Sequence, residues 1–203
     1  MRILPLTLFV CFFTASAASA APSLGRVDSG VLTELENGEV LRSVVAGTPN
    51  HGEALGKIEG TVAEVAATLM DWNTFDQWSP SAYDVRVVGE EGAQTRVAGA
   101  TELPWPISDR TWHIMTRAES LTVDGQECWS MSWTYVAGSG NLEDTSGYWL
   151  ACPWPHDASA SIVRYVVDAD AGIPIPNSVI NWATNRTLPT LFERLNEQVQ
   201  RRR

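Results

Sequence analysis

Lysine is almost absent from this chain of 203 residues, because Lys57 is its only lysine. Cysteine and histidine are also scarce, with three of each. The histidines, His51, His113 and His156, show no metal-ligand spacing, and no Cys-x-x-Cys pair accompanies them. The sequence also has no G-x-S-x-G nucleophile motif and no phosphate-binding loop. We therefore expect no metal, no cofactor and no catalytic residue, and an enzyme is the less favoured class of function.

Basic residues are outnumbered by acidic ones. The chain has 14 Lys and Arg against 24 Asp and Glu, and its net charge is −10. Because so acidic a protein repels phosphate backbones, nucleic acid is not an expected partner. Long apolar runs are missing after residue 20, so no later segment is predicted to cross a membrane. The remaining length is enough for one domain with a sizeable core, not for two.

The N-terminus has the pattern of a cleavable secretory signal. Arg2 precedes an apolar run from Ile3 to Phe13, and a small-residue stretch ends in Ala18-Ser19-Ala20. The run is shorter than the about 20 apolar residues that a spanning helix needs. We predict a signal peptide over residues 1–20, cut after Ala20, and a periplasmic or secreted mature protein. An uncleaved N-terminal anchor is the alternative.

Two cysteines remain after such a cut, Cys128 and Cys152. They lie in apolar stretches that flank the turn-rich segment 138–144. A hairpin centred near Gly140 would place them directly opposite each other. In an oxidising compartment this arrangement allows a cross-strand disulfide. Two buried thiols are the alternative, and neither state indicates catalysis.

Strands and two short helices are predicted in the first part of the domain. After one helical turn or short strand near Val31, strands are expected around 40–45 and 53–59. Thr61 and Glu64 match a capping box, which indicates the start of a helix. We expect Asp71 to cap a second short helix that ends at Ser79-Pro80. The aromatic residues of this second helix are expected to fill the core in preference to paving a lid: Trp72, Phe75 and Trp78.

From Tyr83 onward the pattern changes to a meander of about six antiparallel strands. β-rich runs are separated by Gly, Pro, Asp and Asn. In the run 129–135 every second residue is large and apolar, so one side of that strand must be buried. The predicted strands are Tyr83 to Val88, Gln94 to Leu103, Arg110 to Ala118, Gln126 to Ala137, Ser146 to Cys152 and Ser161 to Asp168.

A long amphipathic helix is predicted from about Asn177 to the end of the chain. The prolines of Ile173-Pro174-Ile175-Pro176 precede it, and apolar residues from Ile180 to Val199 recur at helical spacing. Pro189 removes one backbone hydrogen bond and should kink the helix. A kinked helix over a curved sheet leaves a space. The sequence leaves open whether side chains or a ligand fill it.

The order of these elements resembles the helix-grip fold of START domains, relatives of the steroidogenic and phosphatidylcholine-transfer proteins. The block Leu103-Pro104-Trp105-Pro106-Ile107-Ser108-Asp109-Arg110 is similar to the proline-containing turn that leads into a central strand of these domains. The segment Ala67–Pro80 is similar to their second helical region, and the likeness covers roughly 50–200. The resemblance implies an α+β domain over 21–203, with a curved antiparallel sheet wrapped around a long C-terminal helix and two short helices after the first strands.

The resemblance also implies that a lipid or another hydrophobic small molecule is bound in a cavity between the sheet and the C-terminal helix, and it leaves open whether this ligand is also transferred. By strand placement we expect Arg110 and Arg164 to orient a polar head group. Alternatively, Arg110 pairs with Asp109 or Glu102, and Arg164 points outward. Four aromatic residues are expected as cavity wall, although core packing would also explain them: Trp112, Trp133, Tyr135 and Tyr148.

Two other functions stay open. Relatives of this fold include aromatase and cyclase enzymes, and a periplasmic interaction module with a vestigial cavity is the third class. We expect a monomer whose contact with a membrane is transient. The terminal residues Arg201, Arg202 and Arg203 could touch anionic lipid head groups, and a frayed basic helix end is the plainer explanation for them.

Overall fold

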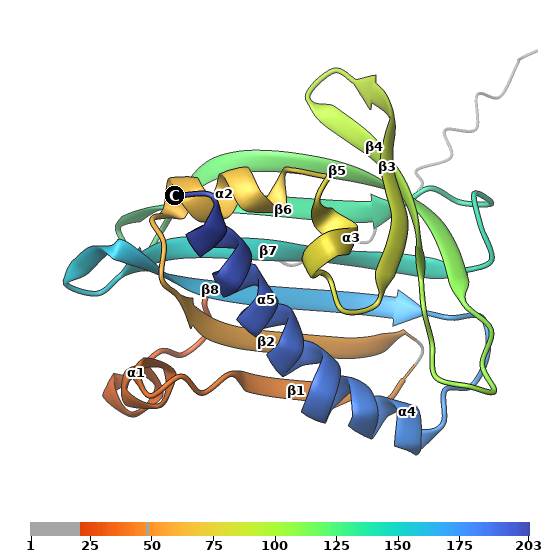
Figure 1. Ribbon diagram of the computed structural model, residues 1–203, viewed down its shortest axis with the longest axis horizontal. Coiled ribbons are helices and arrows are strands. Elements are labelled where there is room, and N and C mark those ends of the chain that lie inside the picture. The colour runs from red at the N-terminus through yellow and green to blue at the C-terminus, as the bar shows by residue number, and fades with distance from the viewer. Residues whose placement is uncertain (1–20, 48) are drawn as a thin grey trace, which may run out of the picture.

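The computed structural model describes residues 21–47 and 49–203, and the predicted signal peptide, residues 1–20, lies outside the described residues. In the described part, eight strands form one antiparallel sheet in the order β1-β2-β8-β7-β6-β5-β4-β3 (Figure 1). The strands are β1 Leu41–Val45, β2 Asn50–Ile58, β3 Ala82–Glu91, β4 Gln94–Thr101, β5 Arg110–Val123, β6 Gln126–Tyr135, β7 Asp144–Trp154 and β8 Asp157–Asp170. The helices are α1 Ser29–Glu36, α2 Val62–Leu69, α3 Phe75–Trp78, α4 Asn177–Trp182, the π-helical segment η1 Ala183–Thr187, and α5 Leu188–Arg201.

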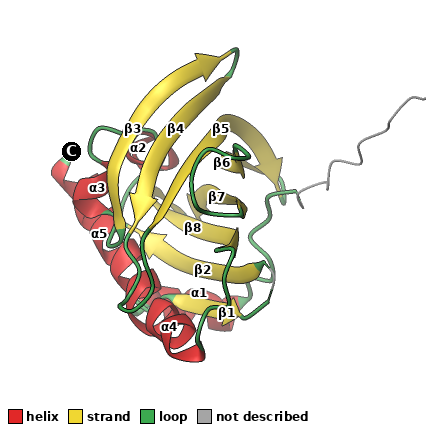
Figure 2. Cartoon of the chain, turned by 90° about the vertical axis from the view of Figure 1, so that its right-hand side faces the viewer, coloured by secondary structure: helices red, strands yellow, loops and turns green. Residues whose placement is uncertain are grey.

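The sheet curves around the terminal helix, which confirms the predicted helix-grip α+β fold. Strands β3 to β8 form the predicted meander, and the last of them also pairs with β2 (Figure 1). The N-terminal strands therefore extend the sheet beyond the meander. Figure 2 shows α3, α4 and α5 together on one side of the curved sheet.

The capping box that the sequence predicts is present at α2. The Thr61 hydroxyl accepts a hydrogen bond from the Glu64 amide, and the Glu64 carboxylate accepts one from the Thr61 amide. The predicted start of the next helix is wrong, because α3 begins at Phe75 and its N-cap is Thr74. Asp71 is engaged elsewhere: its carboxylate accepts a hydrogen bond from Thr74 Oγ1 and pairs with Arg202.

The terminal helix is interrupted by a π-helical segment. Helix α4 continues through η1 into α5, and Pro189 lies in the first turn of α5. A proline has no amide hydrogen and its ring clashes with the carbonyl four residues earlier, so the regular α-helical ladder cannot run through this point. The irregularity predicted at Pro189 therefore takes the form of a wider helical turn just before it.

The C-terminal end of α5 is fixed to α2 by ion pairs. Arg203 contacts both oxygens of the Glu64 carboxylate, at 3.1 and 3.0 Å, and Arg202 pairs with Asp71. Arg201 pairs with Glu197 on its own helix at 2.9 Å. The three arginines therefore have acidic partners within the domain.

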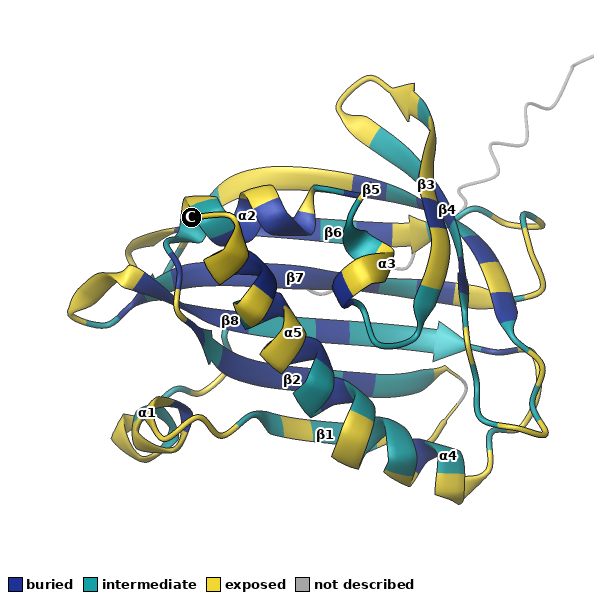
Figure 3. Cartoon of the chain, in the orientation of Figure 1, coloured by how far each residue is buried: buried dark blue, intermediate teal, exposed yellow. Residues whose placement is uncertain are grey.

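Both faces of the sheet are covered, and each has its own core. The concave face packs against α2, α3 and α5 through residues such as Leu69, Phe192 and Leu195. The convex face packs against α1 and the chain before it, and Leu35 of α1 lies within this second core. Helix α1 is capped by the side chain of Asp28. Figure 3 shows the buried residues concentrated in the central strands and on the sheet-facing side of α5.

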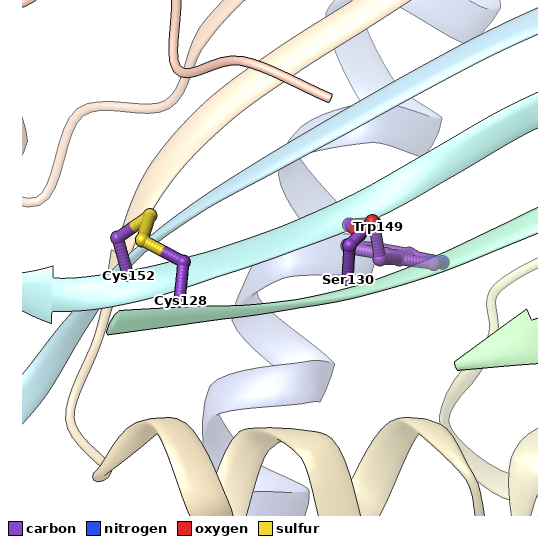
Figure 4. The surroundings of a disulfide bond; sticks show 4 residues. All are labelled: Cys128, Ser130, Trp149 and Cys152. Carbon is purple, nitrogen blue, oxygen red and sulfur yellow. A yellow bond between two sulfur atoms is a disulfide. The ribbon is translucent and has the colours of Figure 1, made fainter. Parts of the chain in front are cut away.

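A disulfide joins Cys128 of β6 to Cys152 of β7 in the convex core (Figure 4). Their Cα atoms are 4.4 Å apart, and the register of the two strands places them directly opposite each other. Further along the same strand pair, the buried hydroxyl of Ser130 donates a hydrogen bond to the carbonyl oxygen of Trp149 at 2.9 Å. The disulfide therefore joins β6 and β7 covalently at one end of this strand pair.

Candidate functional site: an apolar pocket under the terminal helix

A pocket of about 370 Å³ lies between the concave face of the sheet and the helices α3, α4 and α5. Strands β2 and β5 to β8 form its floor, and η1 and the first turns of α5 form its roof. Most of the side chains that line it are apolar. The volume lies within the range of small-molecule sites, roughly 300 to 1,000 Å³. The space that the sequence leaves undecided is therefore not completely filled by side chains.

Glycines on the concave face make room for the aromatic wall of the pocket. A Cβ atom at Gly99 would lie 2.7 Å from the ring of Trp112, and one at Gly147 would clash with the ring of Trp133. Both strands therefore need a residue without a side chain at these positions. The two indole rings occupy the space above these glycines and line the pocket.

Hydrogen bonds fix the same two indoles. Trp112 Nε1 donates to Thr101 Oγ1 at 2.9 Å, and Trp133 Nε1 donates to Thr145 Oγ1 at 3.4 Å. Because these polar N–H groups are satisfied within the protein, the rings offer apolar surface to the pocket. Tyr165 stacks on Trp133, with 5.8 Å between the ring centroids.

Arg110 is the charged residue of the pocket lining. It is the first residue of β5, is only 6% exposed, and lies at the end of the pocket near the loop that leads into α4. Its Nε donates to the carbonyl oxygen of Ala171 at 3.0 Å, and its Nη1 donates to the carbonyl and hydroxyl oxygens of Ser108, both at 3.0 Å. In the described part of the chain, Nη2 makes no hydrogen bond and Arg110 has no acidic partner.

The predicted alternative for Arg110, an ion pair with Asp109 or Glu102, is not what the structure shows. The Asp109 carboxylate accepts hydrogen bonds from the hydroxyl of Tyr83 at 2.7 Å and from the amide of Leu103 at 3.3 Å. Only the backbone carbonyl of Asp109 contacts Arg110, at 3.4 Å. The acid next to Arg110 therefore secures the preceding loop and leaves the arginine without a counter-ion.

Further polar side chains line the pocket, among them those of Tyr165 and Thr187. Burial raises the pKa of the Tyr165 hydroxyl above its ordinary value, so this group stays protonated. No hydrogen bond joins that hydroxyl to a described residue. The hydroxyl of Thr187, in η1, is also buried without a partner in the described structure. The Tyr165 hydroxyl can donate a hydrogen bond to a ligand.

Three of the six residues predicted for ligand binding line the pocket: Arg110, Trp112 and Trp133. Tyr135 lies on the same face of the sheet, packs against the edge of the concave core and is not part of the lining. Its hydroxyl is buried without a partner among the described residues.

Tyr148 and Arg164 face the opposite side of the sheet, so their prediction as pocket residues needs correction. The hydroxyl of Tyr148 donates to the carbonyl oxygen of Ser23, and its ring belongs to the convex core. Successive strand residues point to opposite faces, and in both strands the next residue lines the pocket instead: Trp149 and Tyr165.

Arg164 has a structural role on the convex face, as the outward-pointing alternative expected. Its Nη2 lies 2.6 Å from Oε2 of Glu53, and its Nη1 donates to the carbonyl oxygen of Ser23. Burial raises the pKa of Glu53, but the hydrogen bonds from Arg164 and Ser43 outweigh this effect and hold the pKa below its usual value. Arg164 of β8 therefore contacts β2 through Glu53 and holds the N-terminal segment through Ser23.

The second helical region contributes to the site more than the sequence indicates. Trp72 and Phe75 line the pocket, whereas Trp78 is buried in the core as expected. Their ring centroids form a chain, with 5.2 Å from Trp72 to Phe75 and 4.8 Å from Phe75 to Trp78. Sequence spacing alone cannot distinguish pocket lining from core packing here, because the three rings lie on one short segment.

Within the described residues, no group of three or more His, Cys, Asp or Glu side chains could hold a metal ion. None of the described helices is long and apolar enough to cross a membrane.

No family model and no curated protein matches the sequence. Solved structures do match its fold. A STAR-related lipid transfer protein from Xanthomonas axonopodis aligns with a TM-score of 0.61 at 20% identity, over 79% of this chain and 92% of that one. Human STARD10 aligns with a TM-score of 0.62 at 9% identity, over 89% and 84%. The Zhui aromatase/cyclase from Streptomyces sp. R1128 aligns with a TM-score of 0.57 at 15% identity, over 75% and 94%.

The architecture and these similarities define the class of the domain as a START-like helix-grip fold. Lipid transfer proteins and an aromatase/cyclase share this fold, so the choice between binding and catalysis depends on the pocket itself.

Proposed function

We propose that residues 21–203 form an exported START-like domain that binds a lipid or another hydrophobic small molecule in the pocket under the terminal helix, and carries it through an aqueous compartment. The observation that carries this proposal is the apolar pocket of about 370 Å³ between the concave face of the sheet and α3, α4 and α5. The family of lipid transfer proteins with the same fold supports it.

The energetics of such a pocket favour an apolar ligand. Each methylene group removed from water contributes about 0.8 kcal/mol. About ten methylene groups would therefore contribute roughly 8 kcal/mol, before the loss of ligand freedom on binding is subtracted. The aromatic wall is fixed by its glycines and hydrogen bonds, so little ordering of the protein opposes binding.

A carrier is favoured over a cyclase or aromatase because of what lines the pocket. Among the described lining residues there is no Asp, Glu, His, Lys or Cys side chain. General acids and bases come most often from these residue types, so the hydroxyl groups of the lining, such as those of Ser79 and Ser81, have no such base in the pocket to activate them as nucleophiles. An interaction module with a vestigial cavity would have a packed interior. The open pocket therefore favours ligand binding over this alternative.

Export is part of the proposal. The sequence pattern of residues 1–20 supports it, and so does the Cys128–Cys152 disulfide, because disulfides persist in oxidising compartments. Ser23, three residues after the predicted cut, already contacts Tyr148 and Arg164, so cleavage after Ala20 would keep the described contacts of the domain. Loading and release would require transient contact with a membrane, by a monomer.

Native mass spectrometry of the mature protein, purified from cells that export it, tests the carrier proposal. The expected result is a mass larger than that of the denatured chain, and solvent extraction should release one apolar compound in about equimolar amount. Equal native and denatured masses after incubation with a lipid extract of the host would contradict the proposal.

A further inference from the structure

The pocket combines an apolar lining with one buried guanidinium. Arg110 is the only charged residue among the described residues that line it. Its exposed fraction is 6%, so the guanidinium is largely withdrawn from water. A buried charge is unfavourable unless it is paired or well hydrogen-bonded.

The protein satisfies this charge only in part. The described partners of Arg110 are neutral oxygens of Ala171, Ser108 and Asp109. They occupy Nε and Nη1, and within the described structure Nη2 keeps both of its N–H groups free. The carboxylate of Asp109, the neighbouring residue in the sequence, accepts hydrogen bonds from Tyr83 and Leu103 and does not pair with Arg110. The site therefore has an uncompensated positive charge and free donors at one end of an apolar pocket.

We propose that the ligand is an amphiphile with a single carboxylate, which binds at Nη2 of Arg110 while the apolar body lies along Trp112 and Trp133. This inference rests on the proposed function and names the class of molecule that the same pocket takes. A carboxylate supplies the missing negative charge, and charge-assisted hydrogen bonds to arginine are stronger than neutral ones. The neutral oxygens around Nε and Nη1 hold the guanidinium in place for it.

The volume of the pocket limits the apolar body to one chain or a compact ring system. A volume of about 370 Å³ lies near the lower end of the range for small-molecule sites, roughly 300 to 1,000 Å³. A ligand with one chain or a compact ring system suits a pocket of this size better than a lipid with two full acyl chains. The ligand class is therefore a monocarboxylic acid of moderate length, in contrast to a two-chain phospholipid.

Competition binding tests the inference on the mature wild-type protein. The protein is first loaded with the uncharged fluorescent probe N-phenyl-1-naphthylamine, which is then competed with decanoate, decanol or decylamine. These three compounds have the same ten-carbon chain and differ in the charge of the head group. We expect decanoate to bind about tenfold to a hundredfold more tightly than decanol, the factor that a hydrogen bond to a charged group supplies, and decylamine to bind most weakly.

Two variants test whether Arg110 causes the preference for decanoate over decanol. In Arg110→Gln the ratio of decanoate to decanol affinity should fall to about one, whereas Arg110→Lys, which keeps the charge, should retain part of it. Arg117→Gln is the matched control, because Arg117 lies on the same strand with an exposed side chain paired to Glu119. It should keep the wild-type ratio.

Equal or tighter binding of decanol by the wild type would overturn the inference and leave the carrier function standing. Failure of the probe and of all three decyl compounds to bind would instead contradict the carrier function. The comparison of decanoate and decanol binding to the wild type separates these two outcomes, so the test does not depend on the folding of Arg110→Gln.

Discussion

Arg110 and Ala171 connect the start of the central strand β5 to the loop that leads into the terminal helix. Nε of Arg110 donates to the carbonyl oxygen of Ala171 at 3.0 Å, and the arginine is buried. The same side chain therefore lines the pocket and anchors the chain just before α4. Binding and the position of the helix are linked through one residue.

Loss of this connection should lower stability. Arg110→Gln removes the hydrogen bond to Ala171, which is on the scale of about 1.5 to 3 kcal/mol for a charged group, and loss of the uncompensated buried charge offsets part of this, so the free energy of unfolding should fall by about 1 kcal/mol. Urea denaturation of the ligand-free protein measures it, with Arg117→Gln as the control. An unfolding free energy equal to that of the wild type would show that Arg110 does not anchor the loop.

The Cys128–Cys152 disulfide should also contribute to stability. It closes a loop with a sequence separation of 24 residues. The entropy of a cross-linked unfolded chain predicts a contribution of about 3 kcal/mol for a loop of this size. The double variant Cys128→Ser/Cys152→Ser should therefore unfold at lower urea concentration than the oxidised wild type, and a reductant should shift only the wild type. Identical curves with and without reductant would argue against the bond.

The acid stability of the domain should depend on Glu64. The hydrogen bond from Arg203, with that from the Thr61 backbone, lowers the pKa of this carboxylate from 4.5 to about 2. A carboxylate whose pKa is lower in the folded state stabilises the protein above the unfolded pKa, and the contribution is lost as the pH falls towards the folded pKa. The stability difference between the wild type and Glu64→Gln should therefore shrink as the pH falls from about 4.5 towards about 2.

Thermal unfolding at a series of pH values measures this difference. Glu34→Gln, on the exposed side of α1, is the matched control and should follow the wild type throughout. A difference between the wild type and Glu64→Gln that is constant over the acidic range would exclude the ion pair with Arg203 as its cause.

Sequence patterns located the elements of the fold more reliably than the faces of its central strands. In β6 the alternation of Trp129, Met131 and Trp133 with smaller residues identified the concave face correctly. In β7 the alternation is lost, because residues 147–152 are all buried. The N-terminal segment covers the convex face, so both faces require apolar side chains. The sequence pattern therefore predicts Tyr148 as a pocket residue, whereas its neighbour Trp149 lines the pocket.

The open pocket and the helix irregularity depend on long-range packing. The unpaired state of Arg110 follows from the contacts that Asp109 makes with Tyr83, which lies on another strand. The π-helical segment η1 precedes Pro189, and only the overall path of the helix over the sheet decides how the chain accommodates the proline. Pro189 indicates an irregularity from the sequence alone, but neither its π-helical form nor the unpaired state of Arg110 has a local sequence signal.

Export predicts a defined N-terminus. In cells that process the signal, the mature chain should begin at Ala21, and its intact mass should lack residues 1–20. Mass spectrometry of the periplasmic or secreted fraction measures this directly. A full-length chain retained with the membrane fraction would support the uncleaved anchor instead.

Substitution of two alanines by phenylalanine tests whether a hydrophobic ligand occupies the pocket under the terminal helix. Ala183, in η1, lines the pocket, whereas Ala93, in the turn between β3 and β4, is exposed. Titration with N-phenyl-1-naphthylamine should show saturable binding to the wild type and to Ala93→Phe, and roughly tenfold weaker binding to Ala183→Phe, whose added ring fills part of the space. Equal affinity of all three proteins, or no saturable binding to any of them, would contradict the account.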